Sequence, residues 1–255
     1  MCLVNKPYFC KNMRTLLLFL LISLGLKAQI DSALKIPLVG VHFGGQLPMA
    51  DLYRRFGPNL NSGLSFTYKT KNNWLFGSRF DYMFGRNVKE DVLKQLKTPE
   101  GFVVDNAGYP ADLRVTERGT AVYVYGGKVF KWLSANPNSG LMLSLGAGYL
   151  EHKINLYDAQ KQIAAIKDNM KYGYDRLSVG FSVTQFIGYL FLSENRMLNF
   201  YFGVDCSQSF TKSVRKLNYD TGLPDTAQRL DVLTGLRFGW LLPLYKRTPN
   251  DFYYN

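Results

Sequence analysis

Apolar and polar residues alternate along most of this chain from about residue 36 onward. In residues 141–149, for example, Leu141, Leu143 and Leu145 are separated by smaller or more polar neighbours such as Ser144 and Gly146. A period of two residues is typical of a β-strand that presents one apolar face. Eight segments show this pattern and predict eight strands, within 40–49, 63–70, 74–86, 120–133, 141–149, 198–207 and 230–240, with the sixth of the eight starting at Leu177.

The connections between these segments alternate in length. Short polar connections are expected at 71–73, 134–140 and 193–196, and long ones at 50–62, 87–119, 151–176 and 214–228. Short turns at one end and long loops at the other are typical of barrels in the bacterial outer membrane, with the long loops outside the cell. Helical spacing of apolar residues also predicts a short helix within 88–96 and another within 159–169.

The two faces of the strands differ in a way that predicts which one lines the barrel. One face is rich in Phe, Tyr and Trp, which a water-exposed surface would not tolerate in such number. The other face combines Gly and Ser with a few charges, which suits the narrow, filled interior of an eight-stranded barrel. The reverse arrangement, an apolar interior as in lipocalins, is the alternative. We therefore predict an all-β fold, an eight-stranded antiparallel transmembrane β-barrel whose lumen holds a polar cluster of Arg79, Asp81, Asp205, Asp231 and Arg237.

Two of these charges are expected to form an ion pair. If the last hairpin is symmetric about residue 221, Asp205 lies opposite Arg237, within reach of a hydrogen bond. A lone charge in a narrow lumen would be costly, and pairing offsets that cost. The pair could extend across the lumen to Arg79, Asp81 and Asp231.

The first 28 residues have the pattern of a signal peptide. Residues 16–26 are an uninterrupted apolar run, which follows Lys11 and Arg14 and precedes a small residue, Ala28. We expect residues 1–28 to be removed and residues 29–255 to form the barrel domain. Removal would leave Cys206 as the one cysteine, which excludes a disulfide framework. No later apolar run approaches the length of a transmembrane helix.

The last predicted strand carries a more specific motif. Arg237, Gly239, Leu242 and Leu244 match the polar-x-Gly-x-x-apolar-x-apolar assembly signal, although Pro243 interrupts it and residues 245–255 follow. Over about residues 36–246 the chain resembles the small eight-stranded outer-membrane β-barrel proteins of Gram-negative bacteria, OmpA/OmpX-like in architecture. The resemblance implies an outer-membrane location and folding by the barrel-assembly machinery, and it implies no particular activity.

Candidate chemistry is sparse in this sequence. His42 and His152 have no metal-ligand spacing, and Gly44-Gly45 and Gly126-Gly127 lack the context of a phosphate loop. We expect no catalytic residues, no metal and no cofactor. The formal charge is +12, and +8 would remain after removal of residues 1–28, which carry four basic residues and no acid. Such a charge is compatible with nucleic acid, but we expect an exported protein to meet anionic outer-membrane lipid and lipopolysaccharide instead. The segment 171–176 is either an interfacial anchor or a contact for a partner.

The sequence thus favours a non-enzymatic outer-membrane barrel with a structural or interaction role. Its expected partners are other outer-membrane proteins, as a subunit of a larger assembly or secretion complex. A lipid-modifying enzyme and a narrow channel for small solutes are the alternatives.

Overall fold

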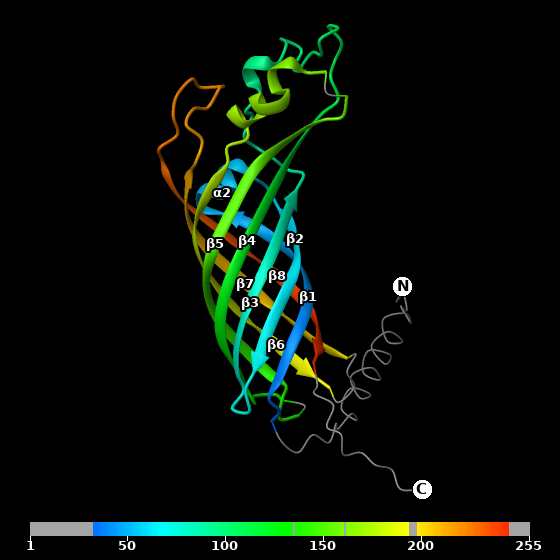
Figure 1. Cartoon of the computed structure of the whole chain (residues 1–255), viewed down its shortest axis with the longest axis vertical. Helices are drawn as coiled ribbons and strands as arrows, with labels where there is room; N and C mark the ends of the chain where they lie inside the picture. The colour runs from blue at the N-terminus through cyan, green and yellow to red at the C-terminus, as the bar shows by residue number, and fades with distance from the viewer. Residues whose placement is uncertain (1–32, 135, 161, 194–197, 245–255) are drawn as a thin grey trace, which may run out of the picture.

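The eight predicted strands form a closed antiparallel barrel in the computed structural model, which describes residues 33–134, 136–160, 162–193 and 198–244 (Figure 1). Each strand pairs with its neighbours in the sequence, and β8 closes the ring on β1. The strands are β1 (Ile36–Met49), β2 (Asn59–Lys69), β3 (Trp74–Gly85), β4 (Leu113–Phe130), β5 (Gly140–Asp158), β6 (Ser178–Leu192), β7 (Asn199–Ser213) and β8 (Gln228–Pro243). The predicted fold is confirmed. In the described part of the chain, no helix has both the length and the apolar character that a membrane crossing requires.

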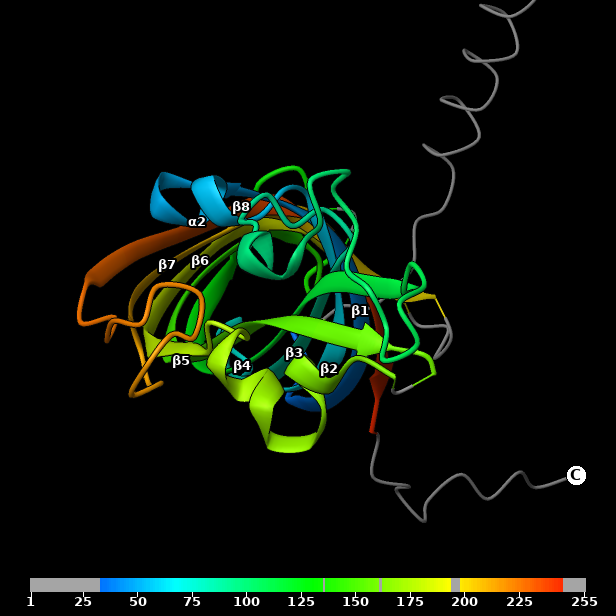
Figure 2. The ribbon, with the colours of Figure 1, turned by 90° about the horizontal axis from the view of Figure 1, so that it is seen from above.

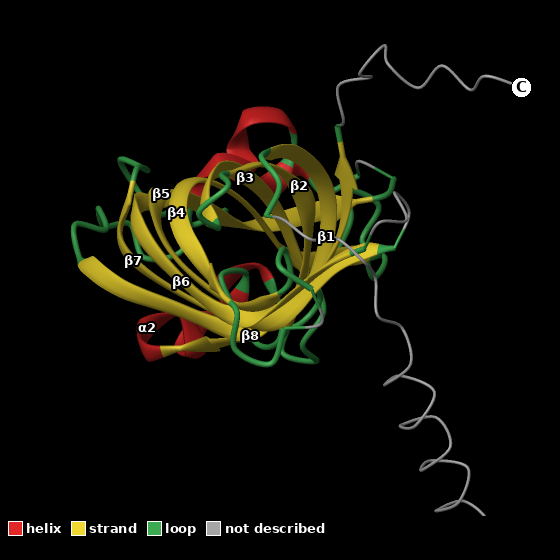
Figure 3. Ribbon diagram, turned by 90° about the horizontal axis from the view of Figure 1, so that it is seen from below, coloured by secondary structure: helices red, strands yellow, loops and turns green. Residues whose placement is uncertain are grey.

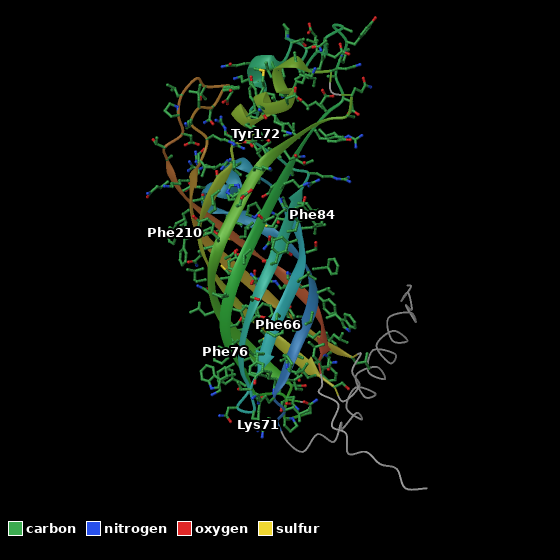
Figure 4. All side chains as sticks on the ribbon, viewed as in Figure 1. Phe66, Lys71, Phe76, Phe84, Tyr172 and Phe210 are labelled. Atoms are coloured by element: carbon green, nitrogen blue, oxygen red, sulfur yellow. The ribbon has the colours of Figure 1, made fainter. Side chains whose placement is uncertain are left out.

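The apolar face of the strands points outward. Phe66 on β2, Phe76 on β3 and Phe210 on β7 are about half exposed or more and project from the barrel wall in Figure 4, whereas Asp205 and Arg237 are buried inside. This is the reverse of a lipocalin. Such an exterior requires a hydrocarbon environment, and a closed barrel satisfies its backbone hydrogen bonds without water. The chain is therefore an integral barrel of the outer-membrane type, in agreement with the predicted location.

The two ends of the barrel differ sharply. Seen from below, the strands form a ring, and the helices are confined to the far end (Figure 3). That far end carries the four long connections, whose described residues lie in 50–58, 86–112, 159–177 and 214–227; we call them the outer head (Figure 2). Because periplasmic turns are short and outer loops long, we take the outer head to face away from the cell.

The helices of the outer head differ from the predicted ones. The helix expected within 88–96 is wrong, because Val88 forms a β-bridge with Phe56 and helical structure is limited to the 3-10 turn η1 (Lys94–Leu96). The segment 159–169 contains η2 (Ala164–Ile166) and the start of η3 (Asp168–Gly173), both 3-10 helices. A short helix that the pattern did not predict, α2 (Ala50–Arg55), follows β1.

The lumen is filled by three layers of side chains. At the short-turn end an apolar cluster includes Leu38, Leu75, Leu190 and Leu241. At the other end a second apolar cluster joins the strands to the outer head, and a polar layer lies between the two. A small cavity of about 30 Å³ lies between the lower cluster and the polar layer, beside Leu38, Arg79 and Arg237. The barrel is therefore a packed core rather than an open pore.

Candidate functional site

Four charged side chains meet in the middle of the lumen. Arg79 Nε lies 3.0 Å from Asp81 Oδ2, and Arg79 Nη1 lies 3.4 Å from Asp205 Oδ1. Arg237 Nη2 forms an ion pair with Asp205 and lies 3.9 Å from Asp81 Oδ2. All four residues are at most 6% exposed. The cluster closes the lumen by joining β3 to β7 and β8.

Small residues beside these charges give their side chains room. Arg237 lies between Gly44 on β1 and Gly203 on β7 in the hydrogen-bonded ladder. Asp81 lies between Gly63 and Ala121 in the same way. Because the interior of an eight-stranded barrel is narrow, the small neighbours of Arg237 and Asp81 leave room for these two side chains. The mixture of glycine and charge on the polar face has this steric cause.

The structure brings together four of the five residues of the predicted lumen cluster. The predicted register is wrong by two residues: Asp205 pairs with Gly235, and Arg237 pairs with Gly203, so the ion pair is diagonal. The last hairpin is not centred on residue 221, as the symmetry argument assumed. Asp231 does not join the cluster. It lies nearer the outer end, where its Oδ2 is 2.9 Å from His152 Nε2 and also accepts a hydrogen bond from Thr211.

Two buried histidine–aspartate pairs were missed by the sequence argument. His42 Nε2 lies 2.7 Å from Asp81 Oδ1, and His152 Nε2 pairs with Asp231 as described. His42 reaches Asp81 across β2, because Gly63 stands between them in register and has no side chain. A glycine flanked in register by a histidine and an acid was the available signal, but it can be used only once the strand pairing is known.

These pairs do not make a hydrolase site. Nδ1 of each imidazole has no hydrogen-bond partner among the described side chains, and both histidines are at most 1% exposed. A nucleophilic hydroxyl would have to lie within hydrogen-bond reach of the histidine, with access for substrate. Nor do the described residues contain a group of three or more His, Cys, Asp or Glu side chains that could hold a metal ion.

A chain of ion pairs links the four loops of the outer head. Arg55 Nε lies 2.9 Å from Glu90 Oε2, Glu90 Oε1 lies 2.9 Å from Arg176 Nε, and Arg176 Nη2 lies 2.5 Å from Asp220 Oδ2. Each of the four residues comes from a different long connection. The apolar cluster beneath them includes Leu52, Phe56, Val92, Leu93, Ile163 and Ile166, which come from three of those connections. The outer head is therefore a single packed body.

Two further ion pairs in the outer head change the pKa of one of their two members. The hydrogen bond to Asp175, with Nη2–Oδ2 at 2.5 Å, raises the pKa of Arg215. Burial alone would raise the pKa of Asp225, but the hydrogen bond and charge of Arg229 outweigh it and hold the pKa below its usual range.

The segment 171–176 belongs to the outer head and lies above the apolar band, away from a membrane interface. Tyr174 is buried in an edge-to-face contact with Tyr219, at 5.6 Å between ring centroids. Asp175 and Arg176 are buried in the ion pairs above. Tyr172, labelled in Figure 4, is exposed beside the guanidinium of Arg215. Most of the segment therefore holds the head together, and Tyr172 faces outward.

The residues of the predicted assembly signal lie on both sides of the wall of β8. Arg237 and Gly239 face the lumen, and a Cβ at Gly239 would lie 2.2 Å from the ring of Tyr201, so only glycine fits there. Leu242 and Leu244 are exposed on the outside. The tail 245–255 and the predicted signal peptide 1–28 lie outside the described residues.

Comparisons with known proteins find likeness in fold. No family model matches the sequence, and no curated protein matches it. Similar solved structures include the attachment invasion locus protein Ail of Yersinia pestis, with 14% identity, a TM-score of 0.41, and coverage of 81% of this chain and 97% of that one. The N-terminal β-barrel domain of OprF from Pseudomonas aeruginosa has 12% identity, a TM-score of 0.38, and coverage of 82% and 100%. Neisserial surface protein A has 10% identity, a TM-score of 0.37, and coverage of 80% and 95%.

Proposed function

We propose that this protein is a non-enzymatic outer-membrane barrel whose outer head binds another protein, as a subunit of a larger assembly or secretion complex. The observation that carries the proposal is the chain of ion pairs from Arg55 through Glu90 and Arg176 to Asp220, because it contains one residue from each of the four outer loops. Loops tied in this way present a fixed surface, so binding would not require them to be ordered first.

The surface of the outer head has the composition of a protein interface. Tyrosine is enriched at the centre of such interfaces, because it supplies a large contact area with few rotatable bonds. The head exposes Tyr53, Tyr109, Tyr172, Tyr219, Met170 and Leu223. All of these lie clear of the apolar barrel wall, so contact with lipid does not account for their exposure.

The alternative functions are less well supported by the same geometry. A channel would need a continuous path, whereas ion pairs between β3, β7 and β8 cross the lumen and an apolar cluster fills its lower end. A lipid-modifying enzyme would need a nucleophile beside His42 or His152, and both imidazoles are buried away from the surface.

The test is affinity purification of the tagged protein after extraction in mild detergent. A variant with Tyr109→Ala, Tyr172→Ala and Tyr219→Ala removes three exposed rings of the head. A matched control, Trp132→Ala with Leu133→Ala, removes exposed apolar side chains at the short-turn end. We expect the co-purifying protein to be lost from the head variant and kept by the control. Equal recovery from both variants, or stepwise conductance of the wild type in a planar bilayer, would contradict the proposal.

We also propose that residues 1–28 are a cleaved signal peptide, and that the end of β8 is read by the barrel-assembly machinery. Amino-terminal sequencing of the protein from outer membranes should begin near Gln29. An epitope tag at Gly108 should be reached by antibody on intact cells, and a tag at Lys71, in the turn between β2 and β3, should not. The reverse labelling would overturn the assigned orientation.

A further inference from the structure

Basic side chains gather on the outer wall of β3, β4 and β5. Arg118 on β4 pairs in register with Phe84 on one side and with Lys153 on the other. Farther along the same face Thr116 is opposite Asn155, and Arg114 is opposite Tyr157. A groove of about 660 Å³ runs over these residues and is lined by Arg86, Arg114, Val115, Thr116, Arg118, Asn155 and Tyr157. We call it the basic groove.

The basic groove lies where the apolar band of the barrel ends. Phe84 lies in the row of Arg118, at the lower edge of the groove, and the next rows toward the short-turn end carry Tyr82 and then the exposed Tyr149. The rings of Tyr82 and Phe84 stack at 6.2 Å between centroids. Figure 4 shows Phe84 on the side of the barrel, beneath the outer head. Aromatic girdles mark the level of the lipid headgroups, so the basic groove faces the headgroups of the outer leaflet.

The charges of the basic groove lack enough protein counter-charge. Among the described residues, no ion pair is formed by Arg86, Arg118 or Lys153. Arg114 lies 3.6 Å from Asp112, but both side chains are more than half exposed, and such surface pairs contribute little and exchange readily. Arg118 and Lys153 are like charges placed directly opposite in a ladder, which is destabilising. The nearest acid on this face is the exposed Glu151, opposite Thr120 in the next row, and it takes part in none of the ion pairs found among the described residues.

We propose that the basic groove binds the phosphorylated headgroup of a glycolipid in the outer leaflet. Guanidinium groups recognise phosphate through two parallel hydrogen bonds, and three arginines line the groove. Tyr157 offers a hydroxyl group to the sugar, whereas Thr116 and Asn155 already hydrogen-bond to each other, with Asn155 Nδ2 donating to Thr116 Oγ1 at 3.3 Å. Tyr82 and Phe84 offer an apolar surface to the acyl chains. This site is separate from the protein-binding surface proposed for the outer head, and it depends only on the orientation of the barrel.

The test measures binding of bisphosphorylated lipid A to the full barrel, refolded in zwitterionic detergent, by native mass spectrometry. The test variant combines Arg86→Gln, Arg114→Gln and Arg118→Gln. The matched control combines Arg54→Gln, Lys212→Gln and Lys216→Gln, which removes the same charge from exposed positions elsewhere at the outer end. Refolding of each variant is checked by heat-modifiable gel mobility.

Losing even one charge-assisted hydrogen bond weakens binding by about tenfold, so we expect at least that loss in the test variant. The control should change affinity by less than about twofold, since exposed charges distant from a site contribute little through screened solvent. Dephosphorylated lipid A should bind the wild type as weakly as the bisphosphorylated form binds the test variant.

Three outcomes would overturn the proposal. Equal loss of affinity in both variants would mean a general effect of net charge. Equal binding of phosphorylated and dephosphorylated lipid would show that the site does not recognise the phosphate groups. Displacement of the lipid by inorganic phosphate at similar concentration would mean a site for free anions. None of these results bears on the head variant of the co-purification experiment, so the two proposals can fail separately.

Discussion

The lumen cluster and the ion-pair chain of the outer head use the same chemistry in different surroundings. In the lumen, Arg79, Asp81, Asp205 and Arg237 are almost completely buried. In the outer head, the side chain of Glu90 is 28% exposed, although Arg55 and Arg176, which it joins, are nearly buried. One network therefore excludes water, and the other is reached by water through Glu90.

This difference decides what each network contributes. Removing one partner of a buried ion pair leaves the other as an uncompensated charge, which is strongly destabilising. A carboxylate at the surface can instead be rehydrated when its partner is lost, so the contribution of the pair is small and depends on salt. We therefore expect the lumen cluster to govern the stability of the barrel, and the head network to govern the arrangement of the loops.

The largest effect is expected for Arg237→Gln. The change leaves Asp205 buried with the remaining Arg79 contact at 3.4 Å, and it should cost about 3–5 kcal/mol of unfolding free energy. Urea unfolding in detergent, followed by heat-modifiable gel mobility, measures the loss. The double variant with Asp205→Asn should recover part of it. Strictly additive single changes would show that the two residues do not interact.

A second large effect is expected for Gly63→Ala, which separates His42 from Asp81. The added Cβ would lie 1.9 Å from the Phe80 carbonyl oxygen and 2.7 Å from His42 Nε2. Overpacking of this kind costs about 1–3 kcal/mol. The matched control is Gly45→Ala on the outer face of β1, where the nearest atom would lie at 3.8 Å. If both variants unfold at the same urea concentration, the lumen is looser than the structure shows.

A smaller effect on stability is expected for Arg176→Gln in the centre of the head network. Because water reaches Glu90, the barrel should lose about 1 kcal/mol or less. The loops should respond more, since Glu90 and Asp220 lose their common partner. Limited proteolysis should cut within 86–112 or 214–227 faster than in the wild type, while exposed Arg54→Gln serves as the control. A large loss of barrel stability would show that the two networks are not distinct.

The smallest effect is expected when the pH is lowered, and it concerns the connection 214–227 between β7 and β8. The pKa of Asp225 is held below its ordinary value of 3.8, because Arg229 Nη2 lies 2.7 Å from Asp225 Oδ2 and outweighs the effect of burial. A lowered folded pKa gives stability that is present above 3.8 and is lost as pH falls through the lower value. Protection of 214–227 from an acid-active protease should therefore be equal at neutral pH and at about pH 5, and should decline only below pH 3.8. Loss of protection at about pH 5 would contradict this assignment.

The sequence predicted the parts of the strands that cross the membrane but not the parts beyond it. Alternation is strong where one face meets lipid, as at Phe76, Phe80 and Tyr82 on β3. It disappears at 113–119 and 151–158, where the outward positions carry Arg118, Lys153 and similar residues, so the pattern predicts loops at these strand ends. Both faces of a strand can be polar once it has left the hydrocarbon.

The candidate site could be predicted only in its composition. The polar face identified Asp205 and Arg237 as partners, but the true register depends on a turn whose centre the sequence does not reveal. The helices of the outer head depend on contacts between loops. Val92 and Leu93 are buried, as the helical pattern predicts for the apolar face of a helix. Their segment is nevertheless not an α-helix.

The two long strands β4 and β5 set the height at which the protein meets its surroundings. β5 has 19 residues and spans about 60 Å along its own direction. A tilted strand crosses the hydrocarbon within about 9–11 residues, so nearly half of this hairpin stands clear of the bilayer. In Figure 1, β4 and β5 extend up to the outer head at the top of the molecule. The outer half of the β4–β5 hairpin thus projects from the membrane. It carries the loops 86–112 and 159–177 away from the membrane surface, whereas 50–58 lies closer to it. A large partner approaching from the medium would first meet the loops at the end of the β4–β5 hairpin, whereas a neighbour in the membrane would meet α2.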